Sequence, residues 1–230
     1  MFLKVPKNTR YEIKFVTYEH NYYSIINWIK LHELNFKREY SSRFVNNIYF
    51  DSPSYNSFKS NIYGDSSRIK LRYRWYEKLQ DPSQGSFEIK FKRNLYGWKR
   101  RFKIKELNFK DNNDWKSFCR TICKNLPEEE KIFFKFNLNP QIINQYQRDY
   151  FVTSDNKLRI TVDKKHDIYD QRYSSYPNLN KKTLNQRVLI MEFKFDRKER
   201  ARINKLMNYI PMRSSRNSKY VNSIRAVSGF

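Results

Sequence analysis

The chain has 230 residues, with 47 Lys or Arg against 23 Asp or Glu, which gives a formal net charge of +24. Such a basic chain favours a polyanionic partner, whether nucleic acid, anionic lipid or phosphate. No run approaches the roughly 20 apolar residues of a membrane-spanning helix, and two cysteines argue against a disulfide-bonded scaffold. We therefore expect a cytoplasmic protein that is associated with a membrane at most through a partner.

Apolar residues at every second position predict strands in the first half of the chain, and apolar residues at helical spacing predict one helix. The helix is expected over 17–33, with Thr17 as its N-cap. Turns at "QDPSQGS" and "NLYG" separate the last three strands, so that the final two form a hairpin. The expected strands are 10–16, 43–51, 68–78, 87–93 and 98–107.

The second half of the chain mixes helices and strands. A helix is expected over 114–124, with Cys119 and Cys123 on its apolar face as a reduced, buried pair. The polar, Tyr-rich stretch 164–186 has no clear period and is expected to be a long loop. The remaining expected elements are strands over 144–153, 157–163 and 187–196 and an amphipathic helix over 198–210.

No internal repeat and no linker rich in Pro, Gly or Ser divides the chain, so residues 1–230 are expected to form a single domain. About eight strands, mostly antiparallel, with a few helices indicate a mainly β (α+β) fold. A closed or nearly closed β-barrel with peripheral helices fits this pattern, because closure leaves no strand edge exposed.

The stretch "RIKLRYRWY" at 68–76 places a cation at every second position, so one face of the expected strand carries only positive charge. For a single strand, the simplest explanation is a solvated outer face. The alternation recurs on six strands, which favours an inward ring of cations around a bound phosphate chain, because buried cations without partners are very costly. The charged faces carry Glu12 and Lys14; Arg68, Lys70, Arg72 and Arg74; Glu88, Lys90 and Lys92; Lys99, Arg101, Lys103 and Lys105; Arg159 and Asp163; and Glu192 and Lys194.

Eight short motifs occur in an order that resembles the VTC domain, the polyphosphate polymerase domain of the vacuolar transporter chaperone. This domain belongs to the triphosphate tunnel metalloenzyme (CYTH-like) superfamily. The resemblance covers nearly the whole chain, from about Arg10 to Ile224, and the set of motifs is more specific than any one of them. The motifs are "RYEIKF", "VNNIYFDSPSYNSF", "RIKLRYRWY", "FEIKFKRNLYGWKRR", "NQYQRDYF", "LRITVD", "LIMEFKF" and "SRNSKYV".

The resemblance implies an eight-stranded antiparallel β-barrel tunnel with peripheral helices, whose inner wall binds the triphosphate of ATP and a growing polyphosphate chain. It implies an enzyme, a phosphotransferase that moves the γ-phosphate of ATP onto polyphosphate and releases ADP. It also implies a divalent cofactor, Mn²⁺ or Mg²⁺, and suggests a membrane protein as a partner for export of the polymer.

Two other functions stay open at the level of the sequence. One is a metal-dependent inorganic or nucleoside triphosphatase of the same fold, in which water replaces the phosphate acceptor. The other is a non-catalytic module that binds polyphosphate, nucleic acid or an anionic membrane. Nucleic acid is the less favoured partner, because the aromatic residues alternate to the face opposite the cations.

Residue by residue, Glu192 in "LIMEFKF" resembles the metal-binding glutamate of the family. Catalytic roles are implied for Glu192 with Lys14, Arg72, Arg74 and Lys90. Arg suits bidentate phosphate contacts and Lys suits point-charge contacts. The expected phosphate-binding residues are Lys14, Lys70, Arg72, Arg74, Lys90, Lys99, Arg101, Arg148, Arg159 and Lys219.

Several of these residues have structural alternatives. The wider superfamily opens with E-x-E-x-K, but Arg10 stands first here, and fewer carboxylates favour polyphosphate synthesis or binding over hydrolysis. The alternatives are an ion pair of Arg148 with Asp149 or Asp163, a solvated helix position for Lys219, a salt bridge of Glu192 to a tunnel lysine, and charge-balancing roles for Glu12 and Glu88.

Overall fold

The computed structural model describes residues 6, 10–94, 96–105, 107–109, 114–137, 139–207 and 210–229. Its main element is one antiparallel sheet of nine strands in the order β6-β2-β3-β4-β5-β1-β9-β7-β8, with a further pairing of β6 with β7. The strands are β1 (Arg10–Tyr18), β2 (Lys37–Asp51), β3 (Ser67–Tyr76), β4 (Ser86–Arg93), β5 (Tyr96–Lys103), β6 (Asn139–Val152), β7 (Leu158–Asp170), β8 (Lys182–Thr183) and β9 (Val188–Asp196).

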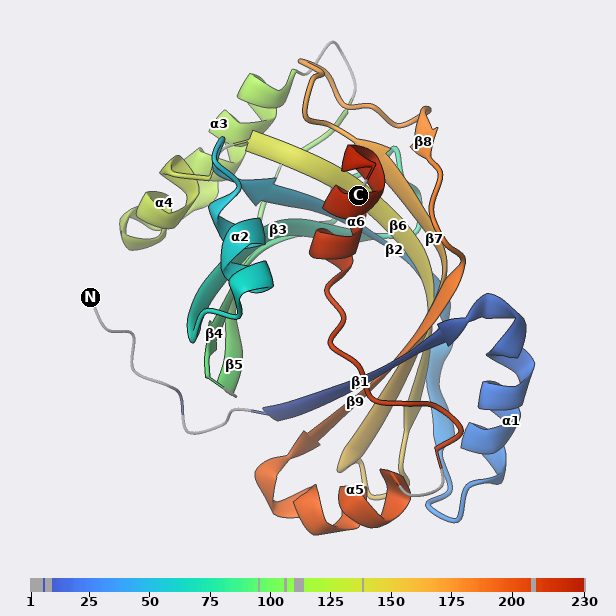
Figure 1. The fold of residues 1–230 in the computed structure, drawn as a ribbon. Coiled ribbons are helices and arrows are strands. Elements are labelled where there is room, and N and C mark those ends of the chain that lie inside the picture. Colours follow the sequence, from blue (N-terminus) through green and yellow to red (C-terminus); the bar gives the residue numbers. More distant parts are fainter. Residues whose placement is uncertain are drawn as a thin grey trace.

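All the strands except the short β8 follow one another around a central tunnel (Figure 1). β6 pairs with both β2 and β7, which brings the two ends of the sheet together. β1 and β5 meet through a single residue pair, Arg10 with Gly97, so the wall is not a closed barrel at this seam. The expected antiparallel tunnel of eight strands is confirmed, but the word barrel describes it only loosely.

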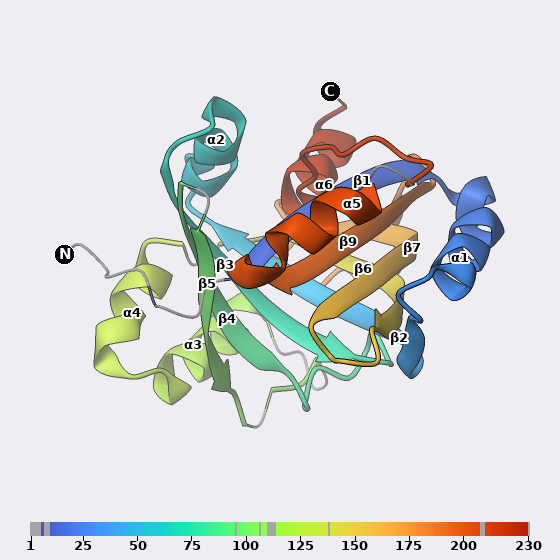
Figure 2. The same ribbon diagram turned by 90° about the horizontal axis from the view of Figure 1, so that it is seen from below.

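Helices cover the outside of this wall on two sides (Figures 1 and 2). α3 and α4 pack on β3 and β4, where Phe118 and Phe134 join Tyr73 and Trp75 in one buried cluster. The apolar rows of the strands therefore face outward beneath the helices, and their charged rows face the tunnel, as the alternation predicts. The helices are α1 (Tyr22–Leu31), α2 (Asn56–Tyr63), α3 (Trp115–Asn125), α4 (Glu128–Lys135), α5 (Arg200–Met207) and α6 (Lys219–Ser228).

α1 and α5 cover the other side, where α5 lies along β9 in Figure 2. Ile29 of α1 and Ile203 of α5 pack with Met191 and Phe193 of β9 in a second buried cluster. Each fully buried apolar side chain contributes on the order of 1.5–3 kcal/mol of transfer free energy. The outer faces thus provide the hydrophobic stabilisation, which leaves the inner face free to carry charge.

α6 differs from the other helices because it packs against residues that face the tunnel. Its Tyr220 ring stacks on Tyr49 of β2 with ring centroids 5.3 Å apart, and Ser223 lies within hydrogen-bond distance of Asn144. The Tyr220 hydroxyl donates to Asp51 Oδ2 at 2.6 Å, and the same carboxylate accepts the N–H group of Phe58 in the first turn of α2. α6 therefore lies over part of one end of the tunnel and is held there by α2 and β2 (Figure 1).

The boundaries differ from the sequence-based expectation in several places, and β2 and β6 begin at Lys37 and Asn139, earlier than the expected 43 and 144. β1 continues to Tyr18, so Thr17 lies in a strand and is not a helix N-cap; its hydroxyl accepts from Asn21 Nδ2 at 2.7 Å. The expected loop 164–186 is in part wrong, because β7 runs on to Asp170 in register with β6, and β8 forms beside it. The β6–β7 ladder contains a register shift. Such a shift interrupts the alternation of apolar and polar residues from which strands are predicted, so the second part of β7 was not recognised.

The helices α2 and α4 were not predicted, and for α6 the sequence suggested only a helix position of Lys219 as an alternative. The expected helix over 198–210 is seen as α5, preceded by a short 3₁₀ turn, and residues 208–209 lie outside the described part of the chain. Neither Cys119 nor Cys123 forms a disulfide, as expected, but only Cys119 of the expected buried pair is fully buried, and Cys123 is half-buried. No helix among the described residues is both long and apolar enough to span a membrane.

Candidate active site: a cationic tunnel

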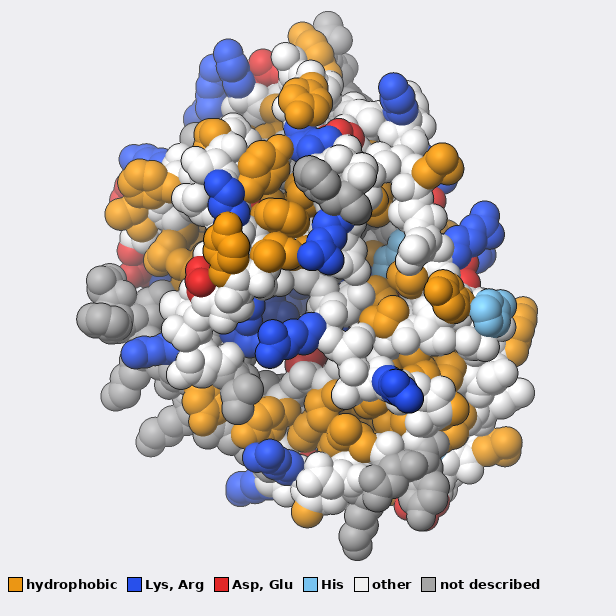
Figure 3. Space-filling model, viewed as in Figure 1, with side chains coloured by type: hydrophobic (Ala, Val, Ile, Leu, Met, Phe, Trp, Pro, Cys, Tyr) orange, Lys and Arg blue, Asp and Glu red, His pale blue; other side chains and the backbone are white. Residues whose placement is uncertain are grey.

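The inner wall of the tunnel is lined mainly by cations. On β3, Leu71, Tyr73 and Trp75 are at most 1% exposed on the outside, so Arg72 and Arg74 between them face inward. Figure 3 shows a hollow near the centre of the molecule that is lined by Lys and Arg side chains with acidic atoms on one side. The cations come from β1, β3, β4, β5, β6, β9 and α6, so the site is assembled from the whole length of the chain.

Glu88 of β4 is the anionic centre of one part of this wall. Its side chain is fully buried, and its carboxylate is 2.5 Å from Arg72 Nη2 and 2.8 Å from Lys99 Nζ. Arg101 Nη2 lies 2.9 Å from the same carboxylate. Burial opposes ionisation, but Arg72, Arg74 and Lys99 outweigh it and hold the Glu88 pKa far below its usual range. Three of the expected phosphate-binding cations thus share one carboxylate, which is the charge-balancing role suggested for Glu88.

Glu12 and Glu192 form a second part of the wall, on β1 and β9. Glu192 is 5% exposed and accepts from Lys194 Nζ at 2.8 Å, while Glu12 lies 2.8 Å from Lys14 Nζ and 3.4 Å from Lys90 Nζ. Burial raises the Glu192 pKa, but the surrounding cations, Lys194 first, bring it well below its ordinary value. Glu192 is therefore an ionised carboxylate at neutral pH and faces the tunnel, as predicted.

Asp163 of β7 organises a third part, next to α6. Arg148 Nε and Nη2 donate to its two oxygens at 2.5 and 2.7 Å, and Lys219 Nζ lies 2.5 Å from Oδ2. Burial raises the Asp163 pKa, yet Arg148 and Lys219 hold it below its usual range. Arg148 therefore forms the ion pair with Asp163 that was one of its structural alternatives. The alternative for Lys219, a solvated helix position, is wrong, because this lysine is paired with Asp163.

Arg74 and Lys70 face the tunnel without an ion-pair partner within the described residues. Arg74 is 8% exposed and donates to Asn47 Oδ1 at 2.8 Å and to the Tyr146 hydroxyl at 3.0 Å. Lys70 donates to Ser218 Oγ at 2.8 Å, and burial together with four neighbouring cations lowers its pKa to about 7. Arg74, held by neutral acceptors, leaves positive charge uncompensated where a polyanion would lie, and Lys70 adds to this charge when it is protonated.

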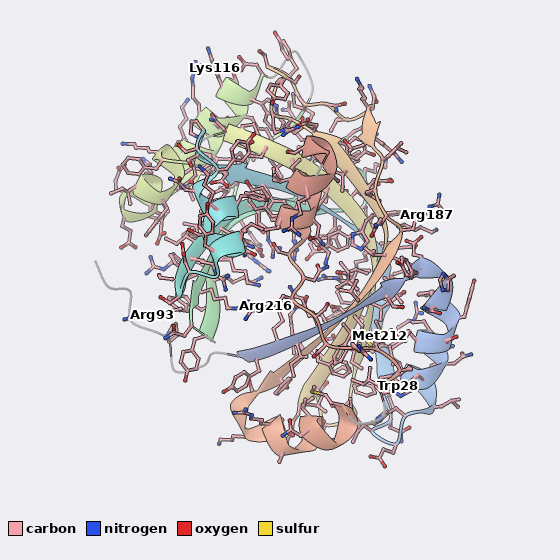
Figure 4. All side chains as sticks on the ribbon, in the orientation of Figure 1. Trp28, Arg93, Lys116, Arg187, Met212 and Arg216 are labelled. Atoms are coloured by element: carbon pink, nitrogen blue, oxygen red, sulfur yellow. The ribbon has the colours of Figure 1, made fainter. Side chains whose placement is uncertain are left out.

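The segment before α6 passes across the tunnel from β1 to α6 (Figure 1). The Ser215 N–H group donates to the Lys14 carbonyl at 2.9 Å, and Lys14 Nζ donates to the Asn217 carbonyl at 3.1 Å. Figure 4 shows Arg216 of this segment in the space that the strands surround, whereas Lys116 lies outside on α3. The segment therefore adds a cation to the tunnel and holds two others, Lys14 and Lys70, through neutral oxygen atoms.

The other predicted residues lie nearer the open parts of the wall. Lys90 is 41% exposed on its side chain and faces Lys99 across the β4–β5 ladder. Burial lowers the Lys99 pKa to about 8, despite the carboxylate of Glu88 beside it. Arg159, the second residue of β7, is 44% exposed on its side chain and lies 3.5 Å from Glu39, opposite Lys194 of β9.

The comparisons with known proteins agree with this arrangement. A family model for the VTC domain matches residues 9–228. The chain belongs to the VTC domain family. Among curated proteins, no sequence matches it.

Two solved structures share the fold of this VTC domain. A candidate adenylyl cyclase from Hippeastrum, HpAC1, which is described as having a dominant triphosphatase activity, is 10% identical, with a TM-score of 0.54 and 96% of each chain covered. A candidate adenylate cyclase from Vibrio parahaemolyticus is 12% identical, with a TM-score of 0.52 and 94% of this chain and 97% of that chain covered. At this identity the likeness concerns the fold alone.

The donor set of the VTC domain fits a hard divalent cation held together with phosphate. Glu192 and Glu12 lie diagonally across the β1–β9 ladder, and the Thr161 hydroxyl, opposite Glu192 in β7, is buried and makes no hydrogen bond to the described residues. Hard cations prefer oxygen ligands, and substrate phosphates supply several of them in phosphoryl-transfer sites. No group of three or more His, Cys, Asp or Glu side chains suited to a metal occurs in the described ranges. A metal would therefore be shared between Glu192 and the bound phosphates.

Sequence reasoning missed three polar residues of this site. Asn47 and Tyr146 hold the Arg74 guanidinium, and Ser218 holds Lys70. The Tyr146 ring also lies 4.6 Å from Lys219 Nζ and 5.2 Å from the Arg148 guanidinium carbon. Its place two residues before Arg148 in "NQYQRDYF" was the available signal, since residues two apart in a strand share a face.

Proposed function

We propose that this VTC domain is an ATP-dependent polyphosphate polymerase, a phosphotransferase of the tunnel family. The observation that carries the proposal is that the buried Arg74 and the half-buried Lys70 have only neutral hydrogen-bond acceptors among the described residues of the inner wall. A buried cation without an anion is costly, so a bound polyanion that supplies the missing charge is favoured. The membership of the VTC domain family supports phosphate as that anion.

In the proposed reaction, a terminal oxygen of polyphosphate attacks the γ-phosphorus of ATP, the bond from that phosphorus to the bridging oxygen breaks, and ADP leaves. Arg72, Arg74 and Lys90 position the triphosphate and stabilise the charge on the transferred phosphoryl group, which is the main catalytic task in phosphoryl transfer. Glu192 would hold Mn²⁺ or Mg²⁺, which neutralises developing charge on the phosphate oxygens. No proton need be taken from the acceptor, because its terminal phosphate is already ionised.

A triphosphatase activity is the second candidate, and one structural observation favours it. α6 lies over part of one end of the tunnel through Tyr220 and Lys219, which narrows the exit for a long polymer there (Figure 1). Water as the acceptor needs no such exit. The triphosphatase activity described for the Hippeastrum protein of the same fold is consistent with this alternative.

Product analysis after incubation with ATP and Mn²⁺ separates these functions. Polyphosphate together with ADP supports the polymerase, and phosphate together with ADP supports the triphosphatase. Absence of turnover, with polyphosphate binding retained, leaves a non-catalytic binding module. The Arg74→Ala variant should lose turnover, whereas the control Lys116→Ala, at an exposed position on α3, should keep it.

If nucleic acid is the true partner, its binding affinity should depend strongly on salt concentration. Counterion release makes the logarithm of affinity fall steeply and linearly with the logarithm of salt concentration. We expect weak DNA binding that short polyphosphate displaces. Tight binding of DNA or RNA that polyphosphate cannot displace would replace the enzyme proposal.

A further inference from the structure

The end of the tunnel opposite α6 carries aromatic side chains around an arginine. The Arg43 guanidinium carbon lies 4.6 Å from the ring centroid of Tyr40 and 5.8 Å from that of Tyr150. The two tyrosine rings meet edge to face at 5.6 Å between centroids. Arg43 makes no ion pair with any residue in the part of the chain that the structure describes. This group, Tyr40, Arg43 and Tyr150, is called the mouth cluster below.

The mouth cluster lies on the inner face of the wall and is continuous with the cationic site. Arg43 faces Arg148 across the β2–β6 ladder, and Tyr40 faces Tyr150 in the same ladder. Tyr150 in turn faces Thr161, which is opposite Glu192 in β9. A ligand whose phosphates reach Glu192 and Arg148 would therefore have its other end beside these rings.

Tyr40 of the mouth cluster is exposed, and Arg43 and Tyr150 are half-buried, whereas the aromatic residues beneath α3 are buried. Tyr40 is 46% exposed, while Tyr73 and Trp75 under α3 are fully buried. Tyr76, the last residue of β3 and on the same face of that strand as Arg74, is 41% exposed and lies near this end as well. Burial raises the Tyr150 pKa to about 12, so its ring is neutral at physiological pH. The neutral tyrosine rings offer stacking surfaces, and the Arg43 guanidinium beside them can stack on a planar group as well.

We propose that the mouth cluster binds the nucleobase of a nucleoside triphosphate whose phosphates lie in the tunnel. The inference rests on the proposed function and extends it from the triphosphate to the base. Inorganic phosphate chains have no planar group to stack, so the cluster distinguishes a nucleotide donor from a phosphate acceptor. Stacking of a base on an aromatic ring tolerates all bases, so we expect little selectivity among ATP, GTP and CTP at this position.

The test compares two ligands on the same variants by calorimetry, a non-transferable ATP analogue and tripolyphosphate. Tyr40→Ala should weaken binding of the ATP analogue about 5- to 150-fold, the range expected for one base–aromatic stack, and leave tripolyphosphate affinity unchanged. Tyr40→Phe keeps the ring and should keep the affinity of both ligands. Tyr63→Ala is the matched control, because Tyr63 is 77% exposed on α2, outside the tunnel.

The unchanged tripolyphosphate affinity also shows that the variant is folded. Equal losses for both ligands, or no loss for either, would overturn the base site while leaving phosphate binding in the tunnel intact. If the unmodified protein binds neither ligand, the proposed function fails and the base site fails with it. A loss with single-stranded RNA larger than that with the ATP analogue would replace the nucleotide by a nucleic-acid strand.

Discussion

Lys219 Nζ lies 2.5 Å from Asp163 Oδ2, and this ion pair ties the first residue of α6 to the inner face of β7. The Lys219 side chain is 11% exposed and the Asp163 side chain is fully buried. Asp163 keeps a bidentate pair with Arg148 on its other side, so Lys219 is the more expendable partner for folding. A substitution of Lys219 should therefore measure the contribution of α6 to phosphate binding without disrupting the strands of the tunnel wall.

Lys219→Met should weaken tripolyphosphate binding about 10- to 100-fold, because a hydrogen bond to a charged group contributes roughly 1.5–3 kcal/mol. The free energy of unfolding, measured in urea, should change far less, because Asp163 remains paired with Arg148. Lys182→Met is the control, since that lysine forms an exposed pair with Asp167. Unchanged tripolyphosphate affinity in Lys219→Met would remove Lys219 from the phosphate site.

Glu88→Gln should lower the free energy of unfolding at pH 7 by about 3–5 kcal/mol, because it leaves Arg72, Lys99 and Arg101 without their shared carboxylate. The folded-state pKa of Glu88 is held below its unfolded value, so its contribution is present above pH ~4.5 and is lost as the pH falls below it. The stability difference between the two proteins should therefore narrow in acid. Urea unfolding at several pH values measures it.

Tripolyphosphate should raise the melting temperature of Glu88→Gln more than that of the unmodified protein, since the anion supplies the charge that the variant lacks. Asp167→Asn, which breaks an exposed pair on β7, serves as the control and should cost at most about 1 kcal/mol. A Glu88→Gln variant as stable as the control would mean that water already compensates the three cations.

The inward cations were predictable because the two-residue period of a strand is a local property. "RIKLRYRWY" alone assigns Arg72 and Arg74 to one face and Tyr73 and Trp75 to the other, as the structure has them. The partners of these cations were not predictable. Glu88 meets Arg72 and Arg101 only because β4 pairs with β3 and β5 in this register, and a sequence does not give the register between strands.

The place of α6 depends on contacts between distant parts of the chain. Tyr220 is fixed by Asp51, which is 169 residues away, so no local pattern in "SKYVNSIRAV" indicates that this helix covers the tunnel. The single-pair contact between β1 and β5 is of the same kind, because strand lengths predict a ring but do not show how completely it closes. The family resemblance predicted the tunnel. Which cations in it have no carboxylate partner depends on how the strands and α6 pair in three dimensions.

Lys70 should take up a proton when a polyanion binds at pH 8. Its folded-state pKa of about 7 lies below the ordinary value of 10.5, first because of burial and then because of neighbouring cations, so it is mostly neutral at pH 8. A bound phosphate favours the charged form and raises this pKa. In the ligand-free protein, the unfolded chain binds more protons than the folded one between pH 7 and 10.5, so this residue makes stability rise with pH there.

Calorimetry of tripolyphosphate binding at pH 8 in two buffers of different ionisation enthalpy measures the proton uptake. Lys70→Met should reduce the uptake by close to one proton, while Lys59→Met, an exposed position on α2, should leave it unchanged. Protonation changes of the ligand itself are common to all three proteins and cancel in the comparison. Equal uptake in the Lys70→Met variant and the unmodified protein would mean that Lys70 is already charged before the anion binds.

Glu192→Gln should separate phosphate binding from turnover. The carboxylate is 5% exposed, faces the tunnel opposite Thr161, and is kept ionised by Lys194, Lys14 and Arg148. Gln keeps the shape but loses the charge that a divalent cation needs from its ligand. We expect affinity for tripolyphosphate without metal to be retained or increased, because a negative charge has been removed from the wall, while Mn²⁺-dependent turnover falls by orders of magnitude.

Mn²⁺ binding in the presence of tripolyphosphate, followed by electron paramagnetic resonance, should weaken in parallel. Glu12→Gln is the comparison, since Glu12 lies on the same wall but is 28% exposed on its side chain. Near-normal turnover in Glu192→Gln with a loss in Glu12→Gln would transfer the metal site to β1.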